Sequence, residues 1–591
     1  MRRAELVLLS VAALSVGLVT TTTAAADDLR IHDIQGSSRL SSYDGQQVSG
    51  VPGVVTAVRG FGSARGFWFQ AETPDGEPAT SEGLFVFTGS VTPDVTVGDR
   101  VEVAGTVDEF APSAAHQSMT ELVRATWTIT ARGVPLPAAE SVSTPARLAP
   151  TGADIDPLPL RPNKYALDYL ESREGMRVRV DDAHVVGPTT EFNELWVTTR
   201  PQEHPSARGG VLYSSYRDDN TGRLKVESLI PFAERPFPEA DVRDTLRGET
   251  SGPLDYDEFG GYLIQATTLG ELVPGGLQPE TTRPQGTGEL AVATYNVENL
   301  APTDPAAKFQ RLAHGVVESL AAPDILSLEE IQDDNGVTND QVVTAGETLS
   351  RFVDAVVAAG GPRYEWRQID PVDDADGGAP GGNIRVAFLF NPARVSFVDR
   401  PGGDATTPVA VTDGHLTVSP GRVAPASPAW TDSRKPLAGE FTFLGRAVFV
   451  VANHFNSKGG DQPMYGRHQP PARPSEAQRQ AQAQEVRGFV KELQRDDRLA
   501  NVVVLGDLND FQFAPALREL TAGYRLIDLV NVLPKVERYS YIYEGNSQTL
   551  DHVLVSGRII DLDYDIVHVN AEFANQASDH DPQVVRLTLS R

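Results

Sequence analysis

The 591-residue chain contains no cysteine. This absence excludes disulfide bonds, thiolate zinc sites, iron–sulfur clusters and cysteine nucleophiles. Metal binding by carboxylate, amide and imidazole groups stays open, because these ligands need no sulfur.

Positive charge is also scarce. Lys and Arg number 51 against 80 Asp and Glu, which gives a net charge of −29. Proteins that hold nucleic acid by bulk charge neutralise phosphates with Lys and Arg, so the overall balance argues against that class. The window 421–500 nevertheless holds twelve basic and eight acidic residues. Because salt screens charges beyond ~8–10 Å, a local basic region of this kind can still attract a polyanion.

After the first 26 residues, no apolar run approaches the ~20 residues that a transmembrane helix needs. Residues 1–26 combine Arg2 and Arg3, an apolar run from Leu6 to Val19, and a small-residue end at Ala26. This pattern is typical of a secretory signal peptide. We therefore predict a soluble, secreted protein that is cleaved near Ala26. Nothing in the sequence indicates a protein partner, and we expect a monomer.

Two proline-rich stretches, 132–162 and 276–287, are predicted to be linkers. Between residues 27 and 131, short β-type runs alternate with Gly, Pro and Asp, which predicts an all-β, OB-like barrel. Three consecutive aromatic residues at 67–69 cannot all face one side of a strand, so core packing is favoured over a base-stacking platform. Segment 163–275 is β-rich, and two interpretations stay open for it: a second barrel, or a β module of another kind.

From residue 288 onward, strand-like and helix-like segments alternate. Helical spacing of apolar residues recurs at 309–322 and again in a long amphipathic segment at 475–494, between apolar runs such as 447–455 and 501–505. Strands outnumber helices. The predicted fold class is therefore α/β, with a two-sheet α/β sandwich over 288–591 that follows the all-β module or modules.

Polar side chains gather where the apolar runs of 288–591 begin or end. Six such clusters occur: 295–299, 329–330, 453–456, 507–509, 551–552 and 578–581. Their members are mostly carboxylates, Asn and His. Carboxylate and amide oxygens favour Mg²⁺, Mn²⁺ or Ca²⁺ over zinc, and histidines beside such a site can carry protons or donate to an anion. Each cluster alone is weak evidence, but the set predicts a hard-cation site.

The same clusters resemble the sequence motifs of a known enzyme superfamily. The matching segments are TYNVENL, PDILSLEEI, NHFNSKGGD, VVVLGDLND, LDHVLVS and SDHDP. Together they make 288–591 similar to the endonuclease/exonuclease/phosphatase superfamily, which includes deoxyribonucleases, sphingomyelinases and inositol phosphatases. NHFNSKGGD with its downstream loop resembles the branch of secreted bacterial nucleases, in which an OB-like module commonly precedes the catalytic domain.

The resemblance implies roles for individual residues. It implies a divalent cation, Mg²⁺ first with Mn²⁺ or Ca²⁺ as alternatives, held by Asn296, Glu298, Glu330 and Asp579. It implies catalytic roles for His454, Asp507, Asn509, Asp551 and His580. In this set Asp551 is expected to pair with His580. Either Asp507 or His580 activates the water, and the sequence leaves that choice open.

One position departs from the family pattern. Where pancreatic-type deoxyribonucleases place a Glu behind the second active-site His, this sequence has Ile384, with Arg385 beside it. The carboxylate behind His454 is therefore in question, and Arg385 becomes a candidate phosphate ligand. With the cations of the basic window, the predicted substrate-binding residues are Arg385, Asn456, Lys458, Arg467 and Arg479.

These observations predict a secreted, metal-dependent nuclease. It would hydrolyse phosphodiester bonds of DNA by in-line attack of water, with RNA left open as a further substrate. The alternative is a secreted phosphodiesterase or phosphatase of the same fold that acts on a lipid or a small phosphodiester, in the manner of a sphingomyelinase. The loop at 457–475 is rich in Gln, Arg and Pro and has few apolar residues, which favours the polyanion.

Overall fold

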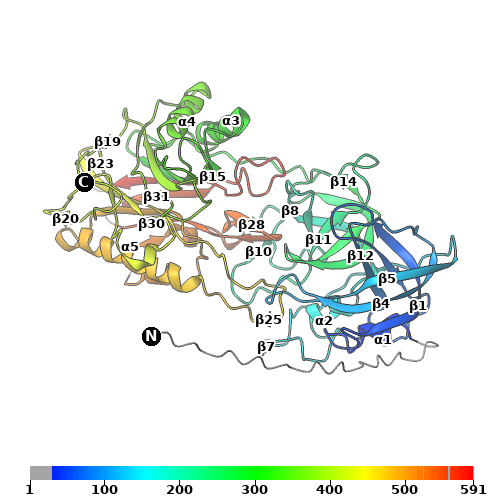
Figure 1. Cartoon of the computed structure of the whole chain (residues 1–591). Coiled ribbons are helices and arrows are strands. Elements are labelled where there is room, and N and C mark those ends of the chain that lie inside the picture. Colours follow the sequence, from blue (N-terminus) through cyan, green and yellow to red (C-terminus); the bar gives the residue numbers. More distant parts are fainter. Residues whose placement is uncertain (1–28, 524, 557–558, 590–591) are drawn as a thin grey trace, which may run out of the picture.

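The computed structural model describes residues 29–523, 525–556 and 559–589 (Figure 1). The predicted signal peptide therefore lies outside the described residues. The molecule is elongated, with the strands of residues 47–273 at one end and most strands of residues 290–589 at the other. No described helix is long and apolar enough to cross a membrane.

The first module is a closed barrel of five strands. These are β1 (Gln47–Arg59), β2 (Arg65–Gln70), β3 (Gly83–Gly89), β4 (Arg100–Phe110) and β5 (Met119–Ala131), preceded by the short helix α1 (Ile31–Gln35). They pair in the order β1-β2-β3-β5-β4 and close on β1, and only β3 and β5 run parallel. Phe67 and Phe69 face the barrel core and Trp68 packs on the opposite side. The aromatic triplet is therefore packing, as predicted.

A second ring of five strands follows with the same order. Its strands are β8 (Arg177–Gly187), β9 (Leu195–Thr198), β11 (Arg223–Ser228), β12 (Thr245–Asp257) and β13 (Gly261–Ala266), flanked by helix α2 (Ala166–Glu171) and by β14 (Glu271–Val273). They pair as β8-β9-β11-β13-β12, and β12 returns to β8. As in the first barrel, the third and fifth strands run parallel. Segment 163–275 was open to two interpretations, a second barrel or a β module of another kind. The strand pairings agree with a barrel.

The proline-rich stretch 132–162 is a long ordered connection rather than a free linker. Its strand β6 (Glu140–Ser141) pairs with β8 of the second barrel. Its strand β7 (Ala153–Asp154) pairs with β25 (His468–Gln469), which belongs to the other end of the molecule. Ile155 is completely buried in the core of the second barrel. The prolines thus shape an ordered connection that packs on both neighbours.

The two barrels meet at a close backbone contact and a buried polar network. A Cβ atom on Gly83 would lie 2.1 Å from the backbone of Gly175, so only glycine allows this approach. Beside the contact, the hydroxyl of Tyr262 donates to Glu171 Oε2 (2.6 Å), and the amide of Thr120 donates to Glu174 Oε1 (2.9 Å). Burial raises the pKa of Glu171 to about 8 against the opposing charge of Arg39.

The raised pKa of Glu171 predicts a pH-dependent stability. Folding raises the pKa of this carboxyl group, so the folded state binds a proton more tightly than the unfolded state. The resulting contribution to the free energy of unfolding is fully present below the unfolded pKa of ~4.3, and it is lost as the pH rises toward the folded pKa. Glu171→Gln keeps an acceptor for Tyr262 and cannot ionise. At pH 9 we expect the variant to be more stable than the wild type by ~5 kcal/mol, because the pKa of Glu171 differs by ~4 units between the folded and the unfolded state.

Scanning calorimetry at pH 5 and pH 9 tests this expectation. At pH 5 the difference between variant and wild type should be small. The exposed Glu102→Gln on β4 is the control, because it removes a carboxylate without changing the buried network. An equal shift at both pH values for Glu171→Gln would contradict the prediction.

The remaining residues form a sandwich of two sheets. The first contains β15 (Leu290–Leu300), β16 (Ile325–Ile331), β17 (Glu365–Arg367), β18 (Arg385–Phe390), β31 (Ile559–Ile566) and β32 (Gln583–Leu589), in the order β17-β18-β16-β15-β32-β31. The second contains β19 (Ser396–Phe397), β22 (Gly421–Arg422), β23 (Leu437–Phe443), β24 (Arg446–His454), β26 (Asn501–Asp507), β27 (Ile527–Asp528) and β30 (Asp551–Val555), in the order β19-β23-β24-β26-β30-β27 with β22 paired to β23.

Helices cover the outer face of each sheet (Figure 1). These are α3 (Ala306–His314) and α4 (Gly346–Ala358) on the first, and α5 (Glu476–Asp496) and α6 (Pro515–Thr521) on the second. Side chains alternate along each strand, so Val292 and Val503 point into the core between the sheets while Ala293 and Val504 pack against the helices. This is the predicted two-sheet α/β sandwich.

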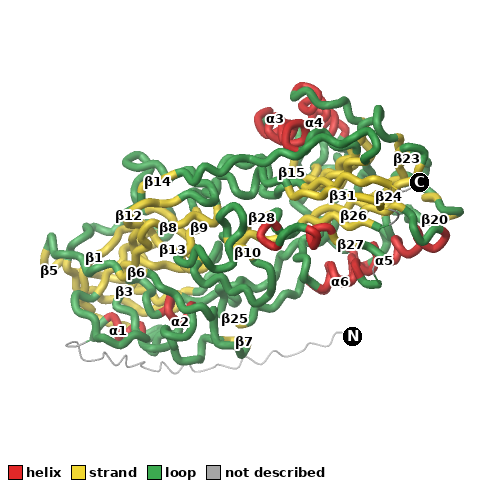
Figure 2. Tube along the Cα trace, turned by 180° about the vertical axis from the view of Figure 1, so that it is seen from behind, coloured by secondary structure: helices red, strands yellow, loops and turns green. Residues whose placement is uncertain are grey.

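A small three-stranded sheet joins the two ends of the molecule. It consists of β10 (Val211–Leu212) from the second barrel and the hairpin of β28 (Tyr541–Tyr543) and β29 (Asn546–Gln548) from the sandwich. β10 and β28 lie between the barrels and the sandwich in both views (Figure 2).

Candidate active site

The site lies where strands of both sheets begin or end at one edge of the sandwich. In the second sheet, the pairing places His454, Asp507 and Asp551 side by side on three neighbouring strands. In the first sheet, the parallel strands β15 and β16 deliver Asn296 and Glu330 to the same edge, because parallel strands end together. The buried polar clusters predicted from the sequence therefore meet in space.

Several site residues hold a left-handed backbone conformation. The φ angle is 52° at Glu298, 63° at Glu330 and 48° at Asn509. Non-glycine residues rarely adopt such angles, and each costs of the order of ~1–3 kcal/mol, so they persist where the surroundings enforce them, typically at functional sites. Here the strain turns the side chains at the strand ends toward one centre.

Crowded carboxylates form the floor of the site. The side-chain amide of Asn296 donates to Glu330 Oε1 (3.0 Å) and to Asp507 Oδ2 (3.2 Å). Burial raises the pKa of Asp507 to about 7, with a further rise from Asp551 against the opposing charge of His580. Burial likewise raises the pKa of Glu298 to about 7, and the charges of Asp579 and Glu330 add to that rise.

This donor set fits a hard divalent cation. One ligand atom each from Glu330, His454 and Asp507 lies within 4.8 Å of the other two. A cation there would offset the repulsion that raises the carboxyl pKa values, and the oxygen-rich surroundings suit Mg²⁺, Mn²⁺ or Ca²⁺. Glu330 is placed to hold the ion, and the charges of Glu298 and Asp579 act on the same region of the site.

Asn296 has a different position from the one predicted for a metal ligand. Its amide nitrogen, not its oxygen, points at Glu330 and Asp507, and its Oδ1 accepts from the backbone amide of Glu298 (3.0 Å). With all its polar groups engaged in this way, Asn296 orients the carboxylates around it.

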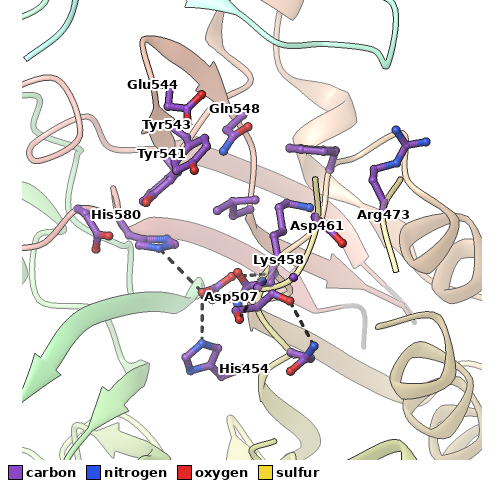
Figure 3. Close-up of a pocket in the computed structure, with 18 of the residues that line it drawn as sticks. His454, Lys458, Asp461, Arg473, Asp507, Tyr541, Tyr543, Glu544, Gln548 and His580 are labelled. Atoms are coloured by element: carbon purple, nitrogen blue, oxygen red, sulfur yellow. Dashed lines mark hydrogen bonds and ion pairs between the residues drawn. The ribbon is translucent and has the colours of Figure 1, made fainter. Parts of the chain in front are cut away.

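His580 pairs with Asp551, as predicted. Its Nδ1 lies 2.8 Å from Asp551 Oδ2, which also accepts from the hydroxyl of Ser540 (2.7 Å). The ring of Tyr541 packs against the imidazole, with centroids 4.7 Å apart. Burial lowers the pKa of His580, but the charges of Asp551, Asp579 and Asp507 outweigh it and raise the pKa well above its usual value. The Nε2 atom faces Asp507 at 3.9 Å (Figure 3).

His454 has the opposite character. Burial lowers its pKa well below the usual value, and the positive charges of Arg434 and His580 lower it further. Its Nε2 lies 3.5 Å from Asp507 Oδ2, while in the described part of the chain its Nδ1 has no hydrogen-bond partner. The carboxylate that the family places behind this ring is thus absent here, in agreement with Ile384 at that position. The site therefore pairs one protonated imidazole with one neutral imidazole.

Asn509 supports Asp507. Its backbone amide donates to Asp507 Oδ1 (2.7 Å), and its side-chain amide donates to Asp507 Oδ2 (3.2 Å) and to the carbonyl of Phe455 (3.1 Å). Asn509 also lines the cleft at the site. It therefore holds Asp507 in place and leaves a face toward the substrate.

Two predicted substrate-binding residues, Asn456 and Lys458, do line this cleft, which has a volume of about 880 Å³. Lys458 Nζ pairs with Asp510 (3.2 Å) and lies 3.9 Å from the centre of the Phe511 ring. Burial lowers the pKa of Lys458 to about 8, so most of it is charged at neutral pH.

The prediction is wrong for Arg385. Its guanidinium is buried beneath the surface, donates to the carbonyl of Asn383 (2.7 Å) and pairs with Asp370 (2.9 Å). It does not line the cleft.

The prediction is also wrong for Arg467 and Arg479. Arg467 pairs with Asp154 at 2.7 Å, which fastens its loop to the proline-rich connection. Arg479 is completely buried, pairs with Asp510 (3.2 Å) and donates to the carbonyl of Ser457 (3.0 Å). Both cations are engaged by carboxylates of the protein, and neither lines the cleft.

Other residues of the cleft were not predicted from the sequence. Arg434 lines it, lies near Glu330 and Asp507, and donates to the carbonyl of Phe455. Its one sequence signal is a basic pair, Arg434-Lys435, directly before the buried strand β23. Arg473 is one of the cations of the basic window, but it is not among the predicted substrate-binding residues. The remaining cleft residues that the sequence did not single out include Tyr213, Phe511, Tyr541, Tyr543 and Gln548.

The cleft combines carboxylates that could hold a cation with two imidazoles, an arrangement suited to the hydrolysis of phosphate esters. Residues 293–580 match the model of the "Endonuclease/Exonuclease/phosphatase family", and this part of the chain is a domain of that family. Residues 134–274, which contain the second barrel, match a "Domain of unknown function (DUF8508)". A search of curated proteins finds no match.

Solved structures resemble the sandwich at low sequence identity. D. rerio TDP2 complexed with a single-strand DNA product is 16% identical, covers 51% of this chain and 98% of its own, and has a TM-score of 0.33. The human Nocturnin catalytic domain with bound sulfate is 15% identical, with 52% and 100% covered and a TM-score of 0.33. An endonuclease/exonuclease/phosphatase family protein from Bacteroides thetaiotaomicron is 16% identical, with 53% and 100% covered and a TM-score of 0.32.

Proposed function

We propose that the protein is a secreted, metal-dependent nuclease that hydrolyses phosphodiester bonds of DNA and RNA. The observation that carries this proposal is the single cleft in which Glu330, Asp507 and Asp579 face His454 and His580. Lys458 and Arg473 line the same cleft and supply local positive charge in an otherwise acidic protein. Charge of this kind suits a polyanionic substrate.

The arrangement supports a separate role for each of the main residues of the site. A divalent cation, Mg²⁺ first, would be held by Glu330 with Glu298 and Asp579 and would polarise the phosphate. Asp507 accepts the proton of the attacking water, since its raised pKa makes it a competent base near neutral pH. His580, kept protonated by its carboxylate neighbours, donates to the phosphate oxygens and to the leaving oxygen. Of the two candidates that the sequence leaves open, we propose Asp507 as the base.

The proposal is tested by incubating the mature protein with plasmid DNA, RNA and sphingomyelin vesicles in Mg²⁺, Mn²⁺, Ca²⁺ or EDTA. We expect both nucleic acids to be cut with Mg²⁺, no cleavage in EDTA, and a loss of activity with rising salt, because phosphate contacts are salt-sensitive. Hydrolysis of sphingomyelin without cleavage of nucleic acid would contradict the proposal and favour the lipid phosphodiesterase.

Export and assembly are part of the proposal. The amino-terminal pattern supports cleavage near Ala26, which N-terminal sequencing of protein from culture medium would test. We further propose that the chain acts as a monomer and that both barrels are of the OB type, since they share one strand order.

A further inference from the structure

The second barrel forms part of the active-site cleft. Its residues Tyr213 and Glu258 line the same cleft as Asp507 and His580. The match to a domain of unknown function covers this barrel, so nothing assigns it a role. The question is what a barrel at the edge of a catalytic cleft does to the substrate.

One wall of the cleft is the hairpin 541–548, and the second barrel holds it. Val211 of β10 pairs with Asn546 of the hairpin. Arg223 of the barrel donates to the carbonyl of Glu544. Gly545 (φ 71°) turns the hairpin against Trp196, where a Cβ atom would come within 2.8 Å of the tryptophan side chain. The tip of the hairpin is therefore fixed by the barrel.

The other wall is the loop 457–474, and it is anchored on the barrels as well. Tyr465 inserts into the core of the second barrel, and its hydroxyl donates to the carbonyl of Asn220 (3.2 Å). The side chain of Gln117 in the first barrel donates to the carbonyl of Tyr465 (2.8 Å). The pairing of β25 with β7 fixes the later part of the loop. Both walls thus depend on the barrels for their position.

The two walls differ in chemistry (Figure 3). The hairpin wall presents the rings of Tyr541 and Tyr543, with Glu544 and Gln548 beside them. Tyr541 and Tyr543 are two residues apart on one strand, so their side chains share a face. Tyr543 is 53% exposed, which is unusual for a large aromatic residue inside a cleft.

The loop wall carries two cations, Lys458 and Arg473, and one carboxylate, Asp461, which lies 3.8 Å from Arg479. Lys458 and Arg473 lie on the other side of the cleft from the hairpin (Figure 3). The guanidinium carbon of Arg473 lies 3.8 Å from the centre of the Tyr216 ring. In the part of the chain that the structure describes, no carboxylate lies within ion-pair distance of Arg473, and its Nε has no hydrogen-bond partner. Its charge is therefore available to a ligand, unlike those of Arg467 and Arg479.

We infer that the second barrel selects single-stranded nucleic acid by shaping this cleft, an inference that rests on the proposed function. A single strand exposes its phosphates on one side and its bases on the other. Phosphates then lie along Lys458 and Arg473, and bases stack on Tyr541 and Tyr543 with their edges toward Gln548 and Glu544. A duplex keeps its bases inside and presents phosphates on both outer faces, so it offers nothing to the aromatic wall.

The test compares kcat/KM on three substrates with the full mature chain in Mg²⁺. The substrates are a 20-residue single-stranded oligonucleotide, the blunt duplex of the same sequence, and bis-p-nitrophenyl phosphate, which is too small to span the cleft. We expect the wild type to prefer the single strand over the duplex at least ~10-fold. Tyr543→Ala should lower the ratio of oligonucleotide to small-diester efficiency ~10-fold, since base–aromatic stacking is worth ~1–3 kcal/mol.

Matched variants distinguish a loss of base stacking from a general loss of activity. Tyr543→Phe keeps the ring and should stay within about twofold of the wild type on the same ratio. Phe192→Ala removes an aromatic residue of the second barrel that is 75% exposed and does not line the cleft, so it should leave all three activities unchanged.

The loop wall has its own readout. Binding of a fluorescein-labelled 12-residue DNA single strand is measured by anisotropy in EDTA at several salt concentrations. Arg473→Gln should reduce the slope of log affinity against log salt by ~0.7, which is the value for one lost phosphate contact.

The outcomes are distinct. Equal efficiency on duplex and single strand, or an unchanged ratio in Tyr543→Ala, would overturn the inference and leave the proposed function standing. Hydrolysis of the small diester without cleavage of any nucleic acid would overturn both.

Discussion

Replacing Asp507 by Asn is expected to lower kcat on DNA by at least ~10²-fold, with the fold intact. The carboxylate is almost completely buried between Asn296, Asn509 and the two histidines, so Asn fits the same space. The amide cannot accept a proton from water, and general base catalysis is worth ~10²–10⁴ in rate. Burial and Asp551 disfavour the charged form of Asp507, whereas an amide in its place loses hydrogen bonds from Asn296 or Asn509. Because these effects oppose each other, we expect the melting temperature of the variant to stay close to that of the wild type.

Single-turnover kinetics and calorimetry on the same preparation would measure both quantities. Asp324→Asn is the matched control. Asp324 is completely buried just before β16 of the first sheet, at the end of that strand away from Glu330, and pairs with Arg394 (2.8 Å). Its replacement should lower stability while leaving kcat near the wild-type value. Full activity in Asp507→Asn would remove Asp507 from the mechanism.

The strand-end clusters were predictable because sequence periodicity determines where a buried strand stops. Glu330 follows the apolar run of β16, and Asp507 follows that of β26. Burying carboxylates in an apolar core at those positions would cost free energy. The pattern therefore indicated both the edge of the sandwich and the chemistry of the site at that edge. The pairing of His580 with Asp551 followed from the family resemblance, since the two residues lie 29 positions apart, with Asp551 on β30 and His580 in the segment before β32.

The substrate-binding cations were not predictable in the same way. Lys458, Arg467, Arg473 and Arg479 look alike in the sequence, and their fates depend on the course of one loop. That course is set by Tyr465, which enters the core of a barrel formed more than 190 residues earlier in the chain. Local patterns carry no information about such a contact.

The closure of the second barrel could not be predicted from the sequence for the same reason. It requires β12 to pair with β8 across the intervening strands, a long-range register that no local motif fixes. The aromatic wall escaped prediction for the same reason, because Tyr541 and Tyr543 lie on a short hairpin whose place beside His580 and β10 depends on contacts between distant parts of the chain.

His580→Ala is expected to lower kcat on DNA at least ~10²-fold and to lower kcat on bis-p-nitrophenyl phosphate far less, by ~10-fold. The imidazolium assists the leaving oxygen of DNA, which must be protonated as it departs. p-Nitrophenolate leaves without a proton, so only the contact of His580 with the phosphate is lost for that substrate. Asp507→Asn should instead lower both activities by similar factors, because both substrates need an activated water.

Asp551→Asn separates the orientation of His580 from its charge. The variant retains a hydrogen-bond acceptor for Nδ1, at 2.8 Å in the wild type, but removes the charge that helps to keep the ring protonated. Its activity on DNA should fall with rising pH at a lower pH than in the wild type, since loss of a neighbouring carboxylate lowers the pKa of His580. Equal losses on both substrates in His580→Ala would show that the histidine acts on the attacking water, and the roles of Asp507 and His580 would then be exchanged.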